Sequence, residues 1–236
     1  MSQYIYGKNV VVQRIKNKDT IERLYIEKGK HQDIIKLAKN AKIPIELVAK
    51  SKLDTLAKGN HQGLVAKVMA YQFYKLDDII IKGEEPLIVL LDGVEDPHNF
   101  GAIIRTCEAV GVDGIVILER RAVSVTPTVI KTSVGAIDNV KIVEVTNLSK
   151  TIQQLKDAGY WIVGTDLKKS QDYRSINYKM PIVLVVGSEG KGMSRLVRES
   201  CDFIAKIPMI GKVNSLNVSV ATAVMLYEIF NKRNPV

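Results

Sequence analysis

Five nearly continuous apolar runs constrain the fold of this chain more than any other feature. They occupy residues 87–91, 114–118, 140–145, 161–164 and 182–186, and helical segments alternate with them. Strands that are apolar at every position are buried on both faces, as in parallel sheets covered by helices. The pattern predicts an α/β domain with a mostly parallel sheet.

The first 70 residues predict a second, smaller α/β module. Its expected strands lie at residues 21–26, 45–48 and 63–69, with a helix at residues 32–41. A mixed polar stretch follows and ends in Gly83-Glu84-Glu85-Pro86, which is typical of a linker. We expect the following division: a first domain at residues 1–72, a linker at 73–85, and a second domain at 86–236.

The positive charge of the chain is concentrated in its first third. Residues 1–75 hold 15 Lys and Arg against 6 Asp and Glu, a balance of +9, whereas the remainder carries 19 of each. A basic domain joined to a neutral one favours a polyanionic partner such as nucleic acid. Lysines on solvated helix faces are the alternative interpretation.

Several protein classes are disfavoured by what the sequence lacks. No apolar run reaches the roughly 20 residues of a membrane span, and the polar start is unlike a secretion signal, so the cytoplasm is the expected location. The chain has no G-x-G-x-x-G, no P-loop and no G-x-S-x-G motif. Cys107 and Cys201 lack metal-ligand spacing, and the three histidines are far apart, so no metal site is expected.

Three polar segments follow apolar runs. The first runs from Asp92 to Glu108 and contains Asn99, which could cap the helix that follows, and Arg105. The other two are Gly- and Ser-bearing loops at residues 187–192 and 207–219. Ligands of open α/β sheets bind at the carboxyl ends of strands, so these irregular segments are candidate binding loops.

Together, the three segments resemble the motifs of the SpoU/TrmH family of RNA ribose 2′-O-methyltransferases. The motifs are Asn99-x-Gly101-x-x-x-Arg105, Gly187-Ser-Glu189-Gly-x-Gly192 and Ile207-Pro-Met-x-Gly-x-x-x-Ser215-Leu-Asn217-x-Ser219. The resemblance covers residues 87–231. Residues 4–70 are similar to the substrate-binding domain of many such enzymes, which is related to the ribosomal protein L30e fold. The family resemblance implies a SPOUT fold, a parallel sheet tied in a trefoil knot.

The resemblance also implies an S-adenosylmethionine cofactor. By position, Gly187, Ile207 and Leu216 would contact it, and Thr165 is a further candidate at the end of the preceding strand. Without the resemblance, Ile207 and Leu216 would be interpreted as core residues.

The family's catalytic positions fall on Asn99, Arg105, Glu189, Ser215 and Asn217. A guanidinium is always protonated, so we expect Arg105 to hold phosphate or stabilise an alkoxide rather than accept a proton. The two asparagines could orient Arg105 or the ribose, and Glu189 could pair with Arg105, including across a subunit interface. The simpler interpretation of Glu189 is an acid near a helix N-terminus.

The final expected helix, residues 218–230, is apolar nearly all round and must be buried on more than one side. Family members are homodimers that use this helix, so a homodimer is expected. The preferred substrate is a guanosine in 23S rRNA, because the N-terminal domain resembles that of the rRNA enzymes. The alternatives are a tRNA 2′-O-methyltransferase and a non-catalytic RNA-binding or ribosome-assembly factor.

Overall fold

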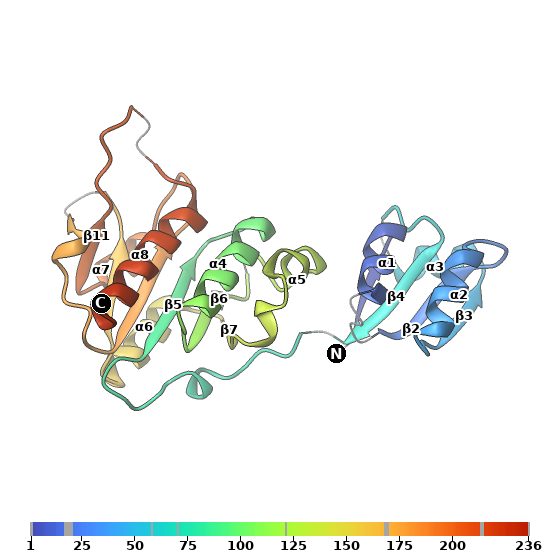
Figure 1. Cartoon of the computed structure of the whole chain (residues 1–236), viewed down its shortest axis with the longest axis horizontal. Helices are drawn as coiled ribbons and strands as arrows, with labels where there is room; N and C mark the ends of the chain where they lie inside the picture. The colour runs from blue at the N-terminus through green and yellow to red at the C-terminus, as the bar shows by residue number, and fades with distance from the viewer. Residues whose placement is uncertain are drawn as a thin grey trace. The chain divides into compact units, whose positions relative to one another are not determined.

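The structure, a computed structural model, describes residues 2–16, 21–57, 59–69, 71–120, 122–167, 170–212 and 215–235. The chain divides into two compact units, Met1–Gln72 and Phe73–Val236 (Figure 1). The first unit is the smaller of the two. Each unit has its own sheet.

The first unit is a four-stranded sheet with helices. Its elements are β1 (Ser2–Tyr6), α1 (Lys8–Lys16), β2 (Ile21–Glu27), α2 (Gln32–Asn40), β3 (Ile45–Val48), α3 (Lys50–Leu56) and β4 (Leu64–Met69). The strand order is β1-β4-β2-β3, in which β4 runs antiparallel to both neighbours and β2 pairs in parallel with β3. The sequence predicted β2, α2, β3 and β4, but not β1, α1 or α3.

The two faces of this small sheet carry separate apolar clusters. Leu24, Ile26 and Ala66 face the cluster that includes α1 and α2, whereas Tyr25 and Val65 face α3. Alternate residues of a strand point to opposite faces, so one strand supplies both clusters. The unit therefore has an apolar core on each face of its sheet.

The second unit is a seven-stranded sheet with helices on both faces. Its strands are β5 (Leu87–Asp92), β6 (Gly114–Leu118), β7 (Ile142–Val145), β8 (Trp161–Thr165), β9 (Gln171–Asp172), β10 (Ile182–Gly187) and β11 (Phe203–Lys206). The order is β7-β6-β5-β10-β8-β11-β9, and every pair is parallel. The five apolar runs form β5, β6, β7, β8 and β10, which confirms the predicted parallel sheet. The short strands β9 and β11 were not predicted.

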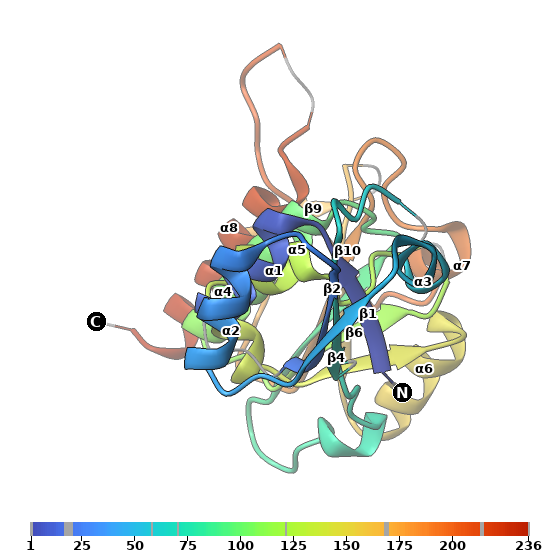
Figure 2. The same ribbon diagram turned by 90° about the vertical axis from the view of Figure 1, so that its right-hand side faces the viewer.

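The helices of this unit are α4 (Pro97–Ala109), α5 (Pro127–Ser133), α6 (Leu148–Asp157), α7 (Arg195–Glu199) and α8 (Val218–Arg233). Figure 2 shows α4, α5 and α8 on one face of the sheet and α6 and α7 on the other. Single 3-10 turns lie at Leu76–Asp78, Ala136–Asp138 and Tyr173–Ser175. Across the described parts of the chain, no helix combines the length and apolarity that a bilayer span needs.

Residues 73–85, expected as a linker, are packed against the second unit. Tyr74 donates its backbone N–H to the carbonyl of Ile142 at 2.9 Å. Ile79 is fully buried, and the absence of a side chain at Gly114 makes room for it, since a Cβ there would lie 2.4 Å from Ile79 Cγ2. Because the segment is mostly polar, its composition did not predict that Ile79 would be buried against the sheet.

Arg233 fixes the end of α8 to the rest of the second unit. Its guanidinium donates to the backbone carbonyls of Tyr178 (3.0 Å), Glu85 (2.6 Å) and Met180 (2.8 Å). Burial lowers the pKa of this guanidinium, an effect that the nearby Glu85 carboxylate opposes. Three chain segments are thus tied together by one side chain.

Replacing Arg233 with Met should destabilise the second unit by about 2–3 kcal/mol, because three carbonyls lose a charged donor. Urea unfolding followed by the fluorescence of the single tryptophan, Trp161, would measure the change. The matched control is Lys232→Met in the same turn, whose exposed ammonium donates to one carbonyl, that of Arg174 at 2.9 Å, and which should cost less than about 1 kcal/mol. Equal losses in the two variants would contradict the anchoring role.

Candidate active site

The loop after β10, residues 187–194, closes on itself. Ser188 N–H donates to the Gly192 carbonyl at 3.1 Å, and Gly192 N–H donates back to the Ser188 carbonyl at 2.9 Å. A Cβ at Gly187 would lie 2.2 Å from the carbonyl carbon of Gly192, so no other residue fits there without moving backbone. Glu189 is exposed on this loop. We call this segment the 187–194 loop.

Asp92 holds the far end of the 187–194 loop. It is the last residue of β5, pairs in register with Gly187 of β10, and is 7% exposed. Its Oδ2 accepts a hydrogen bond of 2.6 Å from the backbone N–H of Ser194. A carboxylate this buried requires such a partner, and a charged acceptor makes the bond strong. The loop is therefore anchored to the sheet at both ends.

Two asparagines that are 118 positions apart in the sequence are in contact at the start of α4 and α8. Asn217 Nδ2 donates to Asn99 Oδ1 at 3.0 Å. Asn99 was expected to cap α4, but Asp96 occupies that position and accepts from the backbone N–H groups of His98 and Asn99. The side chain of Asn99 is thereby available for another role.

The cap of α8 determines which way both amides point. Asn217 Oδ1 accepts from the backbone N–H groups of Ser219 (2.9 Å) and Val220 (3.4 Å), so only its Nδ2 can face Asn99. Asn99 must then accept this hydrogen bond through its Oδ1, so its own Nδ2 points away from Asn217. Within the described residues, that NH₂ has no hydrogen-bond partner. Asn99 thus keeps an unpaired donor, and the residue lines the second of the two cavities described below.

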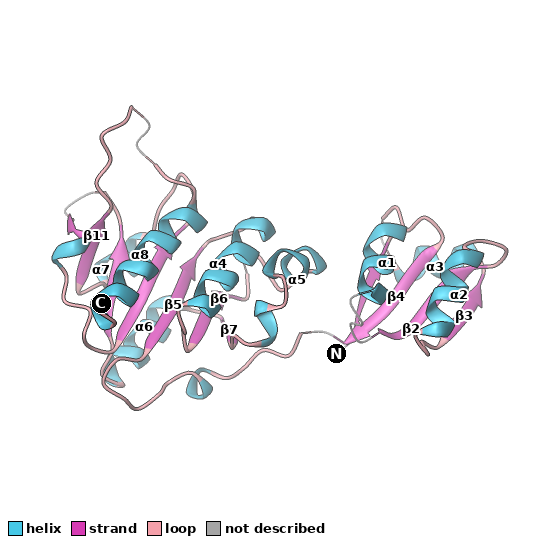
Figure 3. Cartoon of the chain, in the orientation of Figure 1, coloured by secondary structure: helices cyan, strands magenta, loops and turns pink. Residues whose placement is uncertain are grey.

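A cavity of about 600 Å³ lies at the carboxyl ends of β8, β10 and β11. All four residues expected to contact the cofactor line it, namely Thr165, Gly187, Ile207 and Leu216. Two of the expected catalytic residues, Glu189 and Ser215, line it as well. The segment after β11 that supplies Ile207 is irregular (Figure 3), which leaves its backbone groups available to a ligand. We call this space the β8–β10 cavity.

The sequence interpretation missed several residues of the β8–β10 cavity. Asp166 and Leu167 follow Thr165, and Met209 follows Ile207. Arg198 of α7 forms an ion pair with Asp166 at 3.1 Å and fixes the cavity wall. Asp166 and Leu167 follow a strand end directly, and that position was the signal that could have identified them.

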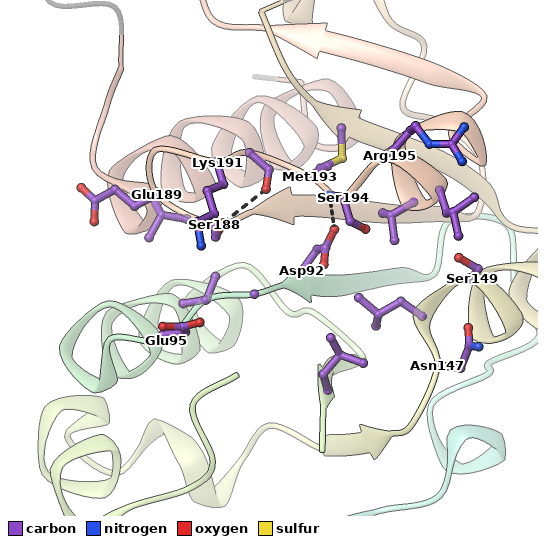
Figure 4. Close-up of a pocket in the computed structure, with 18 of the residues that line it drawn as sticks. Asp92, Glu95, Asn147, Ser149, Ser188, Glu189, Lys191, Met193, Ser194 and Arg195 are labelled. Atoms are coloured by element: carbon purple, nitrogen blue, oxygen red, sulfur yellow. Dashed lines mark hydrogen bonds between the residues drawn. The ribbon is translucent and has the colours of Figure 1, made fainter. Parts of the chain in front are cut away.

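A second cavity, of about 890 Å³, lies on the other side of the 187–194 loop (Figure 4). It is lined from the carboxyl ends of β5, β6 and β7 by Asp92, Glu95, Leu118, Thr146 and Asn147, and by the loop itself. Asn99 and Glu189 also line this space, which we call the β5–β7 cavity. Glu189 and the 187–194 loop are shared by both cavities.

Arg105 lies away from both cavities within one chain. It is exposed on the outer face of α4, in line with His98 and Ala109, and in the third turn of the helix. Among the described residues it forms neither a hydrogen bond nor an ion pair, so it does not contact Glu189. The sequence motif alone could not place its side chain relative to the cavities.

An exposed apolar stripe runs along α8. Val220 and Tyr227 are each 48% exposed, and Phe230 is 38% exposed and packs edge-on against Tyr227. The helix was expected to be buried on more than one side. In the single chain its other side is buried through Met225, Leu226 and Ile229.

The two thiols are poor nucleophiles. Cys107 is fully buried and burial raises its pKa, and burial raises the pKa of Cys201 to about 12. Both therefore stay protonated at neutral pH. Within the described ranges, no three His, Cys, Asp or Glu residues are grouped as metal ligands.

Comparison with known proteins identifies the family. Residues 86–227 match the model of the SpoU rRNA Methylase family, and residues 4–74 match a model described as RNA 2'-O ribose methyltransferase substrate binding. The chain belongs to the SpoU family of methyltransferases. It is 48% identical over 241 residues to YacO of Bacillus subtilis (strain 168), whose name places it in the TrmH family of tRNA/rRNA methyltransferases. That match covers 99% of this chain and 97% of YacO.

Solved structures of SpoU enzymes share the architecture. The AviRb methyltransferase of Streptomyces viridochromogenes, crystallised with AdoMet, aligns with a TM-score of 0.71 and 25% identity over 99% of this chain and 91% of its own. An AdoMet-bound rRNA methyltransferase of Sinorhizobium meliloti aligns with a TM-score of 0.68 and 27% identity over 100% and 88%. These matches extend over both units of the SpoU chain.

The cap of α8 by Asn217 leads to a prediction about the free energy of unfolding. Asn217→Ala removes the cap of α8 and should cost about 1 kcal/mol in the free energy of unfolding. Asn217→Asp keeps an acceptor for the helix N–H groups and should cost less than about 0.5 kcal/mol. Urea unfolding compares the two variants. Equal destabilisation would mean that the cap is not the main role of Asn217.

Proposed function

We propose that this protein is an S-adenosylmethionine-dependent RNA ribose 2′-O-methyltransferase that binds its cofactor in the β8–β10 cavity. The observation that carries the proposal is the meeting of Thr165, Gly187, Ile207 and Leu216 in one space. These residues come from separate segments of the chain, and the family resemblance selects each of them as a cofactor contact. The AdoMet-bound neighbours support the same cofactor.

The residues of the β8–β10 cavity suit that cofactor. The irregular backbone at Ile207 and Leu216 can hydrogen-bond to the edge of an adenine, and their side chains can pack against its faces. Glu189 on the adjoining loop can attract the positive charge of a sulfonium. When bound, the cofactor supplies the methyl group. The chain orients the cofactor, packs apolar side chains against its adenine and places the Glu189 carboxylate near its sulfonium.

The β5–β7 side supplies the groups for the acceptor ribose. Asn99 lines this cavity and its unpaired NH₂ can donate to a ribose oxygen, while Asn217 holds its Oδ1. Glu189 lines both cavities and is placed to receive the proton of the 2′-hydroxyl, directly or through water.

Arg105 completes the site in a homodimer. The exposed faces of α4 and α8 lie on the same side of the sheet. An exposed apolar stripe such as that of α8 is typical of a surface that is buried in a protein–protein interface. In the proposed dimer these faces meet, and the partner's Arg105 reaches the cavities from across the interface to hold phosphate or an alkoxide. A trefoil knot, formed by the chain from β10 to α8, belongs to the same proposal.

The preferred substrate is a guanosine in 23S rRNA, and the proposed location of the protein is the cytoplasm. The match to an rRNA methyltransferase over the whole chain supports rRNA, as does the rRNA Methylase family model over residues 86–227. A tRNA substrate is the second candidate, because the relatives are named for both RNAs. A TrmH/SpoU tRNA modifying enzyme of A. aeolicus is also 38% identical, although that match covers only 67% of this chain and 80% of its own.

Transfer of labelled methyl groups tests the reaction and the role of Arg105. The purified protein should label 23S rRNA at a nuclease-resistant 2′-O-methyl, and Arg105→Ala should lower kcat by about 100-fold or more. Arg105→Lys should recover little, because Lys lacks the bidentate fork. Arg120→Ala, which removes an exposed charge elsewhere in the unit, should retain most activity.

Label in tRNA alone would favour the second candidate substrate. The absence of label with every RNA, despite cofactor and RNA binding, would favour a non-catalytic assembly factor. Full activity of Arg105→Ala would contradict the role given to this side chain.

Binding of S-adenosylhomocysteine, measured by calorimetry, tests the cofactor cavity. Gly187→Ala should abolish detectable binding, because its Cβ would displace the backbone of the 187–194 loop. The control is Gly83→Ala, where a Cβ meets nothing within 4 Å and the affinity should be unchanged. Tight binding by Gly187→Ala would place the cofactor elsewhere.

A further inference from the structure

The proposed function gives the β5–β7 cavity a ribose beside Asn99 but leaves the rest of its volume without a ligand. It lies where the strand order turns, with β6 on one side of β5 and β10 on the other. In open α/β sheets, ligands bind outside the carboxyl ends of the strands at such a point. Its volume of about 890 Å³ is that of a small-molecule site and is ample for a nucleotide.

Three charged side chains of this cavity have no partner. Glu95, Glu189 and Lys191 are all exposed, and within the described residues none of them has a hydrogen-bond or ion-pair partner. Figure 4 shows Glu95 on the β5 side of the cavity and Lys191 on the 187–194 loop opposite. Their neighbours are occupied, since Asp92 accepts from Ser194 and Arg195 pairs with Glu199 at 2.9 Å.

Apart from these charged residues and the helix cap Asp96, the walls of the cavity are apolar or neutral. Leu118 and Leu148 line it from β6 and from the start of α6, and Ser149 follows at the same helix end. Asn99 lines the same cavity, and its NH₂ has no partner among the described residues. The site therefore offers an apolar surface, two unpaired carboxylates, an ammonium and a neutral donor.

We propose that the β5–β7 cavity binds the target nucleotide of the RNA, with its base flipped out of the stack, and that Glu95 selects guanine. This inference rests on the proposed function. The base packs on Leu118 and Leu148, Lys191 holds a phosphate, and the ribose lies at Asn99 beside the shared loop. Guanine alone carries two adjacent donors, N1–H and N2–H, on its pairing edge, and these match the two oxygens of one carboxylate.

The test titrates the full-length protein with guanosine 5′-monophosphate and follows the backbone amide resonances. The nucleotide should shift the resonances of residues 93–96 and 146–149, and adenosine 5′-monophosphate should bind at least tenfold more weakly. Inorganic phosphate should perturb only the region of Lys191. Shifts elsewhere, or equal affinity for the two nucleotides, would overturn the proposal.

Two variants separate the cavity from the rest of the site. Glu95→Gln, on an exposed residue, should weaken guanosine monophosphate binding about tenfold and leave adenosine monophosphate unchanged. Ser149→Trp fills the cavity and should abolish nucleotide shifts, whereas Gln154→Trp, exposed on the same helix and outside both cavities, should not. Neither Glu95→Gln nor Ser149→Trp should change the affinity for S-adenosylhomocysteine.

The same variants distinguish this proposal from the methyltransferase assignment. Guanosine monophosphate binding in this cavity by a protein that labels no RNA would contradict the proposed function and leave the nucleotide site standing. An active enzyme whose kcat/KM for RNA is unchanged by Ser149→Trp and Glu95→Gln would overturn the nucleotide site alone.

Discussion

The two cavities depend on the closed 187–194 loop and its anchor at Asp92. Gly187 permits the turn because its missing side chain leaves room for the backbone of Gly192, and the bond from Ser194 N–H to Asp92 fixes the far end. The loop is therefore a stiff wall between the two cavities, built on the central strands β5 and β10. If this wall moved, Glu189 would lose its place at both cavities.

The position of the wall suggests a division of labour, in which the proposed cofactor occupies one side and the acceptor nucleotide the other. The Asn99–Asn217 pair extends this arrangement, because a helix cap in α8 sets the direction of an amide in α4. Polar groups that are oriented before binding lose little freedom when the substrate arrives, which favours the transition state. Arg105 lines neither cavity of its own chain, so its proposed contribution requires a second copy of the chain.

The sequence predicted the sheet well because strands buried on both faces are apolar at every position, as in β5 and β10. It missed β9, the edge strand, and its neighbour β11 because strands of two and four residues carry little pattern. The resemblance selected Ile207 and Leu216, although composition alone suggested core residues. The roles of Asn99 and of Asn217, by contrast, depend on a contact between elements far apart in sequence, the hydrogen bond between the starts of α4 and α8. Local pattern carries no information on such contacts.

A crystal structure of the protein with S-adenosylhomocysteine would test the division of labour most directly. The account predicts density for the ligand in the β8–β10 cavity, with the adenine between Ile207 and Leu216 and the β5–β7 cavity free of it. Density for the ligand in the β5–β7 cavity, beside Glu95 and Ser149, would contradict the account and reverse the roles of the two sites.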